Sequence, residues 1–132
     1  MNRDEVIQKV QNGGRVIVQL TEADVASIKK DYFRTSRSGW AGGAYRKFVV
    51  QDPTYGTVWF ASSGEWFWNL DVEDRISLKL EISGVGTPSE RYPDPILFAK
   101  PLRKSRDNPL QVIKGGFQVN NFEGTVDLGI NV

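Results

Sequence analysis

The chain of 132 residues contains no cysteine and no histidine. This excludes disulfides, thiol nucleophiles, His/Cys metal cages, Ser-His-Asp triads and imidazole proton shuttles. Among the carboxylates, Asp71 to Asp74 is explained as a solvated turn, and no spacing singles out a catalytic pair or a metal cluster. We therefore expect a protein that is not an enzyme and that needs neither a cofactor nor a metal.

Long apolar runs are also missing. No stretch approaches the roughly 20 apolar residues of a transmembrane helix, and the start, Met1 to Glu5, lacks the apolar region of a signal peptide. We expect no membrane partner and a cytoplasmic location. The length, with 39% hydrophobic and 25% charged residues, fits one globular domain over residues 1–132.

The clearest pattern present is a strict alternation of polar and branched aliphatic residues from Arg75 to Ser83. A period of two is typical of a half-buried β-strand. The alternation directs four side chains to a core: Ile76, Leu78, Leu80 and Ile82. Lys79 lies on the opposite face, toward water or a ligand.

The N-terminal quarter of the chain predicts two short helices, which form an extension over about residues 1–33. The first runs from Asp4 to Asn12 and ends at a glycine pair. A brief strand follows over Arg15–Leu20. Thr21 then resembles an N-cap, and apolar residues at 25 and 28 predict the second helix over Glu22–Asp31.

The remainder predicts six to eight strands and a mainly β fold, a small barrel. Arg34–Ala44 is glycine-rich and aperiodic, which favours a loop. Turn residues between two β-rich runs predict a hairpin, and three prolines mark a later connection. The expected strands are Lys47–Gln51, Thr57–Ala61, Arg75–Ser83, Ile96–Ala99, Leu110–Ile113, Phe117–Phe122 and Thr125–Ile130.

From Phe48 to Lys104, the order of strand, tight turn, aromatic strand and Trp-rich link resembles the central part of an OB-fold. In that family a phrase of the type Leu-x-x-Gly-Asp-x-Val-x-Leu introduces the strand that crosses the barrel. Residues Leu70–Leu78 fill this phrase, with Glu73 where glycine is common. The similarity is greatest to small single-stranded DNA-binding proteins, including those of bacteriophages. If the protein comes from a bacteriophage, we expect to find it inside the bacterial host cell or in the virion.

The resemblance implies a ligand face built from the middle strands and from the loops that join strands one to two and four to five. On this assignment Arg34–Lys47 leads into the first strand, and the turn Asp52–Gly56 is the first loop. The segment Lys100–Arg106 lies near the last loop, and Arg91 and Tyr92 lie in the long proline-bearing loop.

Positive charge is segregated along the chain, although the net charge is only +1. Lys29–Lys47 contains six basic residues against one acidic residue, and Lys100–Arg106 contains four basic residues. Binding of single strands requires cations that follow phosphates and flat rings on which bases stack. The candidate binding residues are Arg34, Arg37, Trp40, Arg46, Lys47, Tyr55, Trp59, Trp66, Trp68, Lys79, Arg91, Tyr92, Lys100, Arg103 and Lys104.

These features predict a sequence-tolerant single-stranded DNA- or RNA-binding protein. Two alternatives stay open: the tryptophans could belong to the core, and the binding partner could be a protein. A tryptophan on a strand is often core packing, whereas Trp40, within a Gly/Ser/Arg loop, favours exposure. The same Trp and Arg residues are also typical of protein interfaces, so a protein-binding, structural or inhibitor module, or a homo-oligomer, fits the composition as well.

Overall fold

The computed structural model describes residues 1–34 and 41–119, without the side chains of residues 31–34, 41–44 and 66. This part of the chain forms two short helices and seven strands. In chain order they are α1 (Arg3–Gln11), β1 (Val16–Arg34), β2 (Ala41–Asp52), β3 (Gly56–Ser62), the 3-10 helix η1 (Glu65–Phe67), β4 (Arg75–Val85), β5 (Leu97–Pro101), β6 (Gln111–Lys114) and β7 (Phe117–Val119).

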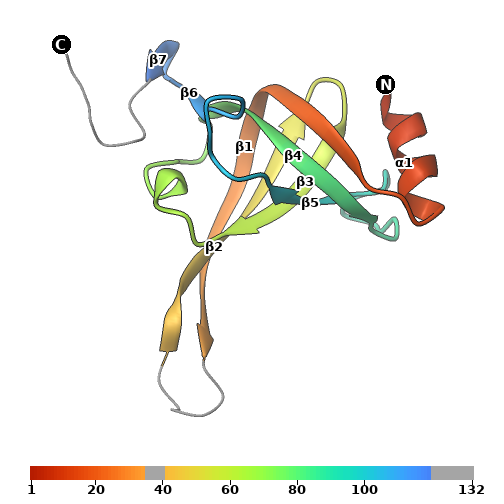
Figure 1. Ribbon diagram of the computed structural model, residues 1–132, viewed down its shortest axis with the longest axis horizontal. Helices are drawn as coiled ribbons and strands as arrows, with labels where there is room; N and C mark the ends of the chain where they lie inside the picture. The colour runs from red at the N-terminus through yellow and green to blue at the C-terminus, as the bar shows by residue number, and fades with distance from the viewer. Residues whose placement is uncertain (35–40, 120–132) are drawn as a thin grey trace.

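Five of the strands close into a small barrel (Figure 1). Their order is β1-β2-β3-β5-β4, and β4 pairs with β1 to complete the ring. β3 and β5 run parallel, and the other neighbours in the ring are antiparallel. This closed five-stranded barrel is consistent with an OB-like fold, and the prediction of a mainly β barrel is confirmed.

β4 is the strand that the alternating pattern predicted. Its four aliphatic side chains at 76, 78, 80 and 82 are buried, and the polar residues between them are partly exposed. β4 pairs with β1 on one side and with β5 and β6 on the other. The core of the barrel therefore depends on one strand that contacts three others.

The prediction of a second helix over Glu22–Asp31 is wrong, because β1 continues through these residues as one strand to Arg34. Register shifts occur at three places along β1, and at two of them, between Leu20 and Ala23 and between Val25 and Ser27, the extra residue lies in β1 itself. At each of these two shifts the next core residue follows three positions later, Ala23 after Leu20 and Ile28 after Val25. That spacing imitates the apolar stripe of a helix.

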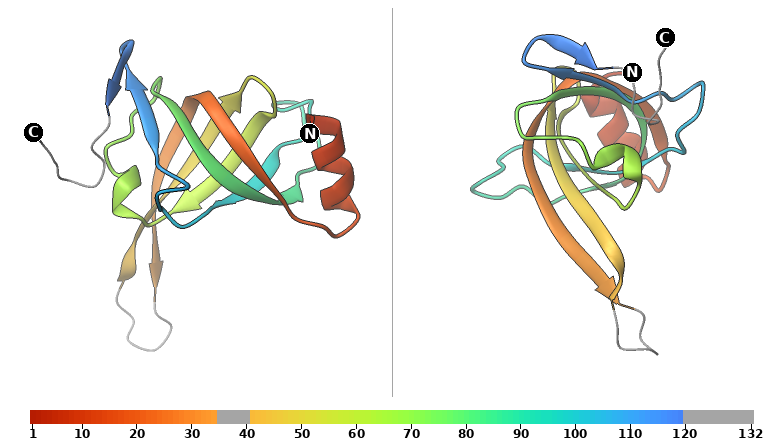
Figure 2. Two further views of the ribbon diagram at one scale, coloured as in Figure 1. Left: turned by 45° about the horizontal axis from the view of Figure 1, so that its top comes forward. Right: turned by 90° about the vertical axis from the view of Figure 1, so that its left-hand side faces the viewer.

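The two helices cover opposite ends of the barrel. In the right-hand view of Figure 2, along the barrel, η1 lies in front and α1 lies behind. Asn2 and Glu5 form a reciprocal capping box that starts α1 near the predicted position, and Val6 is buried against the barrel. At the other end Phe67 packs on Phe48 and Phe60. No helix among the described residues has the length and apolarity to cross a bilayer.

Because β1 extends to Arg34, it is the first strand of the barrel, and each loop lies one position later in the strand order than predicted. The connection between β1 and β2 is residues 35–40, and the turn Asp52–Gly56 joins β2 to β3. The prediction of Asp52–Gly56 as the first loop is therefore wrong. Residues 86–96 join β4 to β5, and they include Arg91 and Tyr92 as predicted.

Segments at both ends of the sheet differ in length from the predictions. β2 begins at Ala41, within the predicted loop, and its first residues pair only with β1, so β1 and β2 extend beyond the barrel as an arm (Figure 1). β6 and β7 confirm two late strands, while the predicted strand Thr125–Ile130 lies outside the described residues.

Candidate nucleic-acid interface

The outward-facing residues of neighbouring strands form two rows across the barrel. The register aligns four of them, the aromatic row, which consists of Ser27, Val49, Trp59 and Phe98. A second line, the cationic row, consists of Lys29, Lys47 and Ala61 and continues on β5 with Lys100, since Phe60 pairs with Ala99. The rows are two residues apart, about 6.5–7 Å.

A hollow of about 300 Å³, the Trp59 hollow, lies over the first three strands of these rows. It is lined by Ser27, Lys29, Lys47, Val49, Trp59, Arg91 and Tyr92. Three of these side chains are cationic and two are aromatic, and none of the described lining residues is acidic. β1, β2, β3 and the β4–β5 loop thus bring together residues that lie far apart in the sequence.

Aromatic contacts hold the rings of this hollow in place. The ring centroids of Trp59 and Phe98 are 5.6 Å apart, and their planes are nearly perpendicular, at 80°. Gly86 provides the space for Phe98, because a Cβ atom at Gly86 would lie 3.0 Å from that ring. The guanidinium of Arg91 lies 5.6 Å from the ring centroid of Tyr92. Trp59 therefore presents a supported indole to the hollow.

A second hollow of about 530 Å³, the Lys100 hollow, lies where β3 and β5 end. It is lined by Ala61, Ser62, Ser63, Lys100, Pro101, Leu102, Arg103 and Lys104. Three of these side chains are cationic, and the described lining residues include neither an acidic nor an aromatic one. The hollow thus contains three of the four basic residues of the segment Lys100–Arg106 that the sequence singled out.

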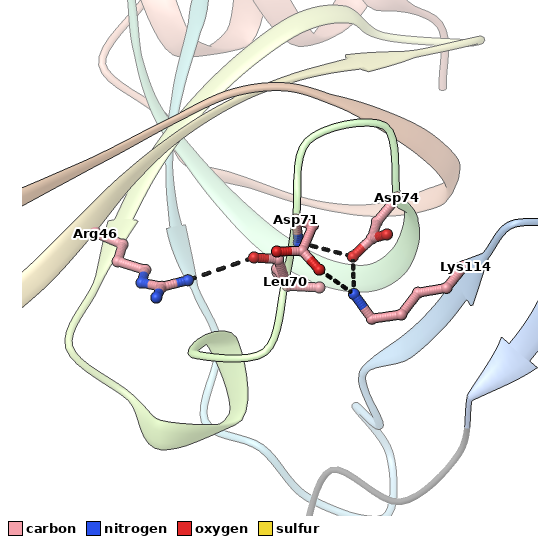
Figure 3. Close-up of polar contacts among 5 residues, drawn as sticks. All are labelled: Arg46, Leu70, Asp71, Asp74 and Lys114. Carbon is pink, nitrogen blue, oxygen red and sulfur yellow. Dashed lines mark hydrogen bonds and ion pairs between the residues drawn. The ribbon is translucent and has the colours of Figure 1, made fainter.

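Arg46 and Trp68 form a separate contact beside the Lys100 hollow. Arg46 Nη1 donates a hydrogen bond of 3.4 Å to the carbonyl oxygen of Leu70 (Figure 3), and its guanidinium lies 5.2 Å from the centroid of Trp68. Trp68 is 38% exposed, and its Nε1 donates to the carbonyl oxygen of Ser63, a lining residue, at 3.5 Å. Arg46 thus anchors the link to β4 and supports Trp68 from one side.

The same link is held from the other side by Lys114 (Figure 3). Its ammonium lies 2.5 Å from Asp74 Oδ2 and 3.0 Å from Asp71 Oδ2. Burial alone would lower the pKa of Lys114, but the hydrogen bonds to Asp74 and Asp71 and the charges of both carboxylates outweigh it, so its pKa is raised. The ion cluster joins β6 to the turn that introduces β4.

Replacing Lys114 with methionine should lower the free energy of unfolding at pH 7 by about 1 kcal/mol, because two carboxylates lose their cation. A raised pKa means that this stability is fully present below the pKa of lysine in the unfolded chain, about 10.4, and is lost as the pH rises through the higher folded pKa. Urea unfolding at pH 7 and near pH 11 tests this: the gap between wild type and variant should shrink at the higher pH. Lys9→Met, at an exposed site in α1, is the control. A gap of unchanged size would contradict the assignment.

The structure brings most of the predicted residues to the two hollows and their rim. Lys47, Trp59, Arg91 and Tyr92 line the first, Lys100, Arg103 and Lys104 line the second, and Arg46 and Trp68 lie beside it. Two lie elsewhere. Tyr55 packs at the α1 end and its hydroxyl donates to the carbonyl oxygen of Met1, and Lys79 lies on β4 opposite Gln19.

Four predicted residues cannot be placed at either hollow. Arg37 and Trp40 lie outside the described residues, as do the side chains of Arg34 and Trp66. The backbone around Trp66 is described, and Glu65–Phe67 forms the 3-10 helix η1, which Trp68 follows directly.

Sequence reasoning missed Ser27, Lys29, Val49 and Phe98 as members of the interface. Ser27 and Lys29 were assigned to the helix that is in fact β1. Phe98 had a signal: in the predicted strand Ile96–Ala99 it alternates with Leu97 and Ala99, which are buried, and it is 37% exposed.

The described residues contain no group of carboxylates that could hold a metal ion. Comparisons of the chain with protein-family models, with curated proteins and with solved structures return no match.

Proposed function

We propose that this barrel binds single-stranded nucleic acid, DNA or RNA, through the Trp59 hollow and the rows around it, with little preference for sequence. One observation carries the proposal: three cations and two aromatic rings from four separate segments line one hollow on the outer face of β1–β3. Cations suit a phosphate chain, and a supported indole suits a base of any identity, because every base has a flat π-face.

The spacing of the rows supports the same function. The aromatic and cationic rows are separated by about 6.5–7 Å, a distance comparable to that between a phosphate and the base it carries. A strand could therefore place phosphates along Lys29 and Lys47 and bases along Val49 and Trp59. A double helix keeps its bases stacked inside, out of reach of Trp59, so single strands should bind more tightly than duplexes.

Replacing Trp59 with alanine should weaken binding to an oligothymidine by about 5- to 150-fold, because one base–aromatic stack contributes roughly 1–3 kcal/mol. Trp59→Phe, which keeps a ring, should lose less and guards against a folding defect. Phe117→Ala is the matched control, since Phe117 is 78% exposed on β7 and lines neither hollow. Titration at low salt, read by tryptophan fluorescence and anisotropy, measures the affinities.

Salt dependence separates this function from a protein-binding module. Affinity for a phosphate chain should fall steeply as salt rises, whereas an aromatic protein interface should change little. Absence of oligonucleotide binding at low salt would reject nucleic-acid binding and favour the protein-interface alternative, which would use the same Trp and Arg surface.

A further inference from the structure

The Lys100 hollow has the chemistry of a site for phosphate groups. Lys100 and Arg103 are exposed and make no ion pair within the part of the chain that the structure describes. Ser62 Oγ accepts a hydrogen bond from the backbone N–H of Gly64, and its hydroxyl hydrogen can point to an acceptor in the hollow. Because none of its described lining residues is aromatic, the hollow suits a sugar-phosphate backbone and offers no stacking surface for a base.

The hollow is also the end of the cationic row. Ala61 and Lys100 belong both to the row and to the lining. The small side chain of Ala61 leaves the row unobstructed between Lys47 and Lys100. Three steps between neighbouring strands separate Lys29 from Lys100, about 14 Å in all. A strand would need on the order of four nucleotides to cover this path and more to enter the hollow.

We propose that the Lys100 hollow is a second phosphate-binding site, and that a single strand crosses the barrel from the Trp59 hollow along the cationic row to reach it. This inference rests on the proposed function, since it extends the path of the same ligand. Oligonucleotides long enough to bridge both hollows engage six cationic residues in the two linings, and shorter ones engage only the Trp59 hollow.

The chain provides a separate fluorescent reporter for each hollow. Trp59 lines the first, and Trp68, whose Nε1 donates to Ser63, lies at the rim of the second. A short oligonucleotide should therefore quench mainly Trp59, and a longer one should quench Trp68 as well. The difference in quenching between wild type and Trp68→Phe isolates the second signal.

The test compares oligothymidines of about 3 and about 12 nucleotides. One OB-fold covers about 4–16 nucleotides, so the shorter oligonucleotide is below this range and the longer one is within it. The variant changes Lys100, Arg103 and Lys104 to glutamine. It should weaken binding of the longer oligonucleotide about tenfold or more at low salt and reduce the slope of log affinity against log salt by up to about 2, since each phosphate contact contributes about 0.7 on a single strand. Binding of the shorter oligonucleotide should change less than about twofold.

The control changes Lys9, Arg15 and Arg75 to glutamine, which removes the same charge from residues that line neither hollow. It should leave both affinities nearly unchanged. If both lengths bind and the Lys100 variant weakens neither, or weakens both equally, the second site is rejected while the proposed function stands. If neither length binds the wild type at low salt, the proposed function fails and the second site with it. Quenching of Trp68 by the shorter oligonucleotide would also overturn the proposed path.

Discussion

Replacing Asp52 with alanine is expected to lower the free energy of unfolding by about 3 kcal/mol. The carboxylate is only 5% exposed, and it accepts three backbone N–H bonds: Thr21 at 3.0 Å, Thr54 at 2.9 Å and Tyr55 at 3.0 Å. Hydrogen bonds to a charged acceptor contribute about 1.5–3 kcal/mol each before overlap, and removing it leaves three partly buried donors without a partner. The loss is a large fraction of the stability of an ordinary small domain.

The geometry explains why one side chain has so large an effect. Asp52 ends β2 and shapes the turn to β3, while its other oxygen reaches across to β1 next to the first register shift. It therefore holds the hairpin and the bent strand together. Asp52→Asn keeps an acceptor oxygen and should lose about half as much. Asp24→Ala, at an exposed site opposite Gln51, is the control and should stay within about 0.5 kcal/mol. Urea unfolding with an unchanged slope measures each loss, and a loss below about 1 kcal/mol for Asp52→Ala would contradict this role.

The course of β1 shows where sequence patterns are misleading. β4 was predicted from alternation alone, because its two faces alternate without interruption from Arg75 to Ile82. Its own register shift, between Ile82 and Gly84, comes only after this stretch. β1 has an extra residue at two of its register shifts, and at the first of these Glu22 has a φ of 49°, in the left-handed region. A bulge changes which face a strand buries without leaving a local signal, and the resulting spacing of three matches a helix. The error could be removed only by knowing the partner strands.

At Glu73 the OB-like phrase correctly indicated the conformation of the backbone. Glycine is common at this position of the phrase, and Glu73 has a φ of 78°, a conformation that glycine adopts freely. Its N–H donates to the carbonyl oxygen of Val25, next to the second register shift of β1. The turn that introduces β4 is thus fitted to a bulge on its neighbour.

The candidate site was predictable in its residue types and not in its arrangement. Basic and aromatic residues stand out in the sequence, and seven of those predicted line the two hollows. Their grouping depends on which residue of one strand lies opposite which residue of the next, and a change of one residue moves every side chain to the other face. Lys47 and Arg46 illustrate this: adjacent in sequence, they lie on opposite faces of β2, one in the Trp59 hollow and one against Trp68.

Asn108 is the second position where a single substitution should have a large effect. On one edge of β4, β6 pairs with Arg75–Ser77 and β5 pairs with Leu80–Val85, which leaves Lys79 in the gap between them. Asn108 Oδ1 accepts a hydrogen bond of 2.6 Å from the N–H of Lys79, and Nδ2 donates to the carbonyl oxygens of Lys79 and Leu102, both at 3.3 Å. The side-chain amide thus makes the hydrogen bonds to Lys79 that the backbone of a neighbouring strand would otherwise make.

Asn108→Ala should therefore lower the free energy of unfolding by about 2–3 kcal/mol, because Asn108 is only 3% exposed. Its loss leaves the N–H of Lys79 and the carbonyl oxygen of Leu102 without this partner, and the carbonyl oxygen of Lys79 keeps only a bond of 3.5 Å from the N–H of Leu102. Asn108→Asp should not rescue it, since a carboxylate cannot donate to the two carbonyl oxygens. Asn69→Ala, at an exposed site, is the control for urea unfolding.

Asn108 also fixes the loop that contains Arg103 and Lys104. The folded Asn108→Ala variant should therefore bind the longer oligothymidine more weakly than wild type and bind the shorter one with unchanged affinity. Equal stability of Asn108→Ala and wild type would show that the gap in β4 is satisfied by other means.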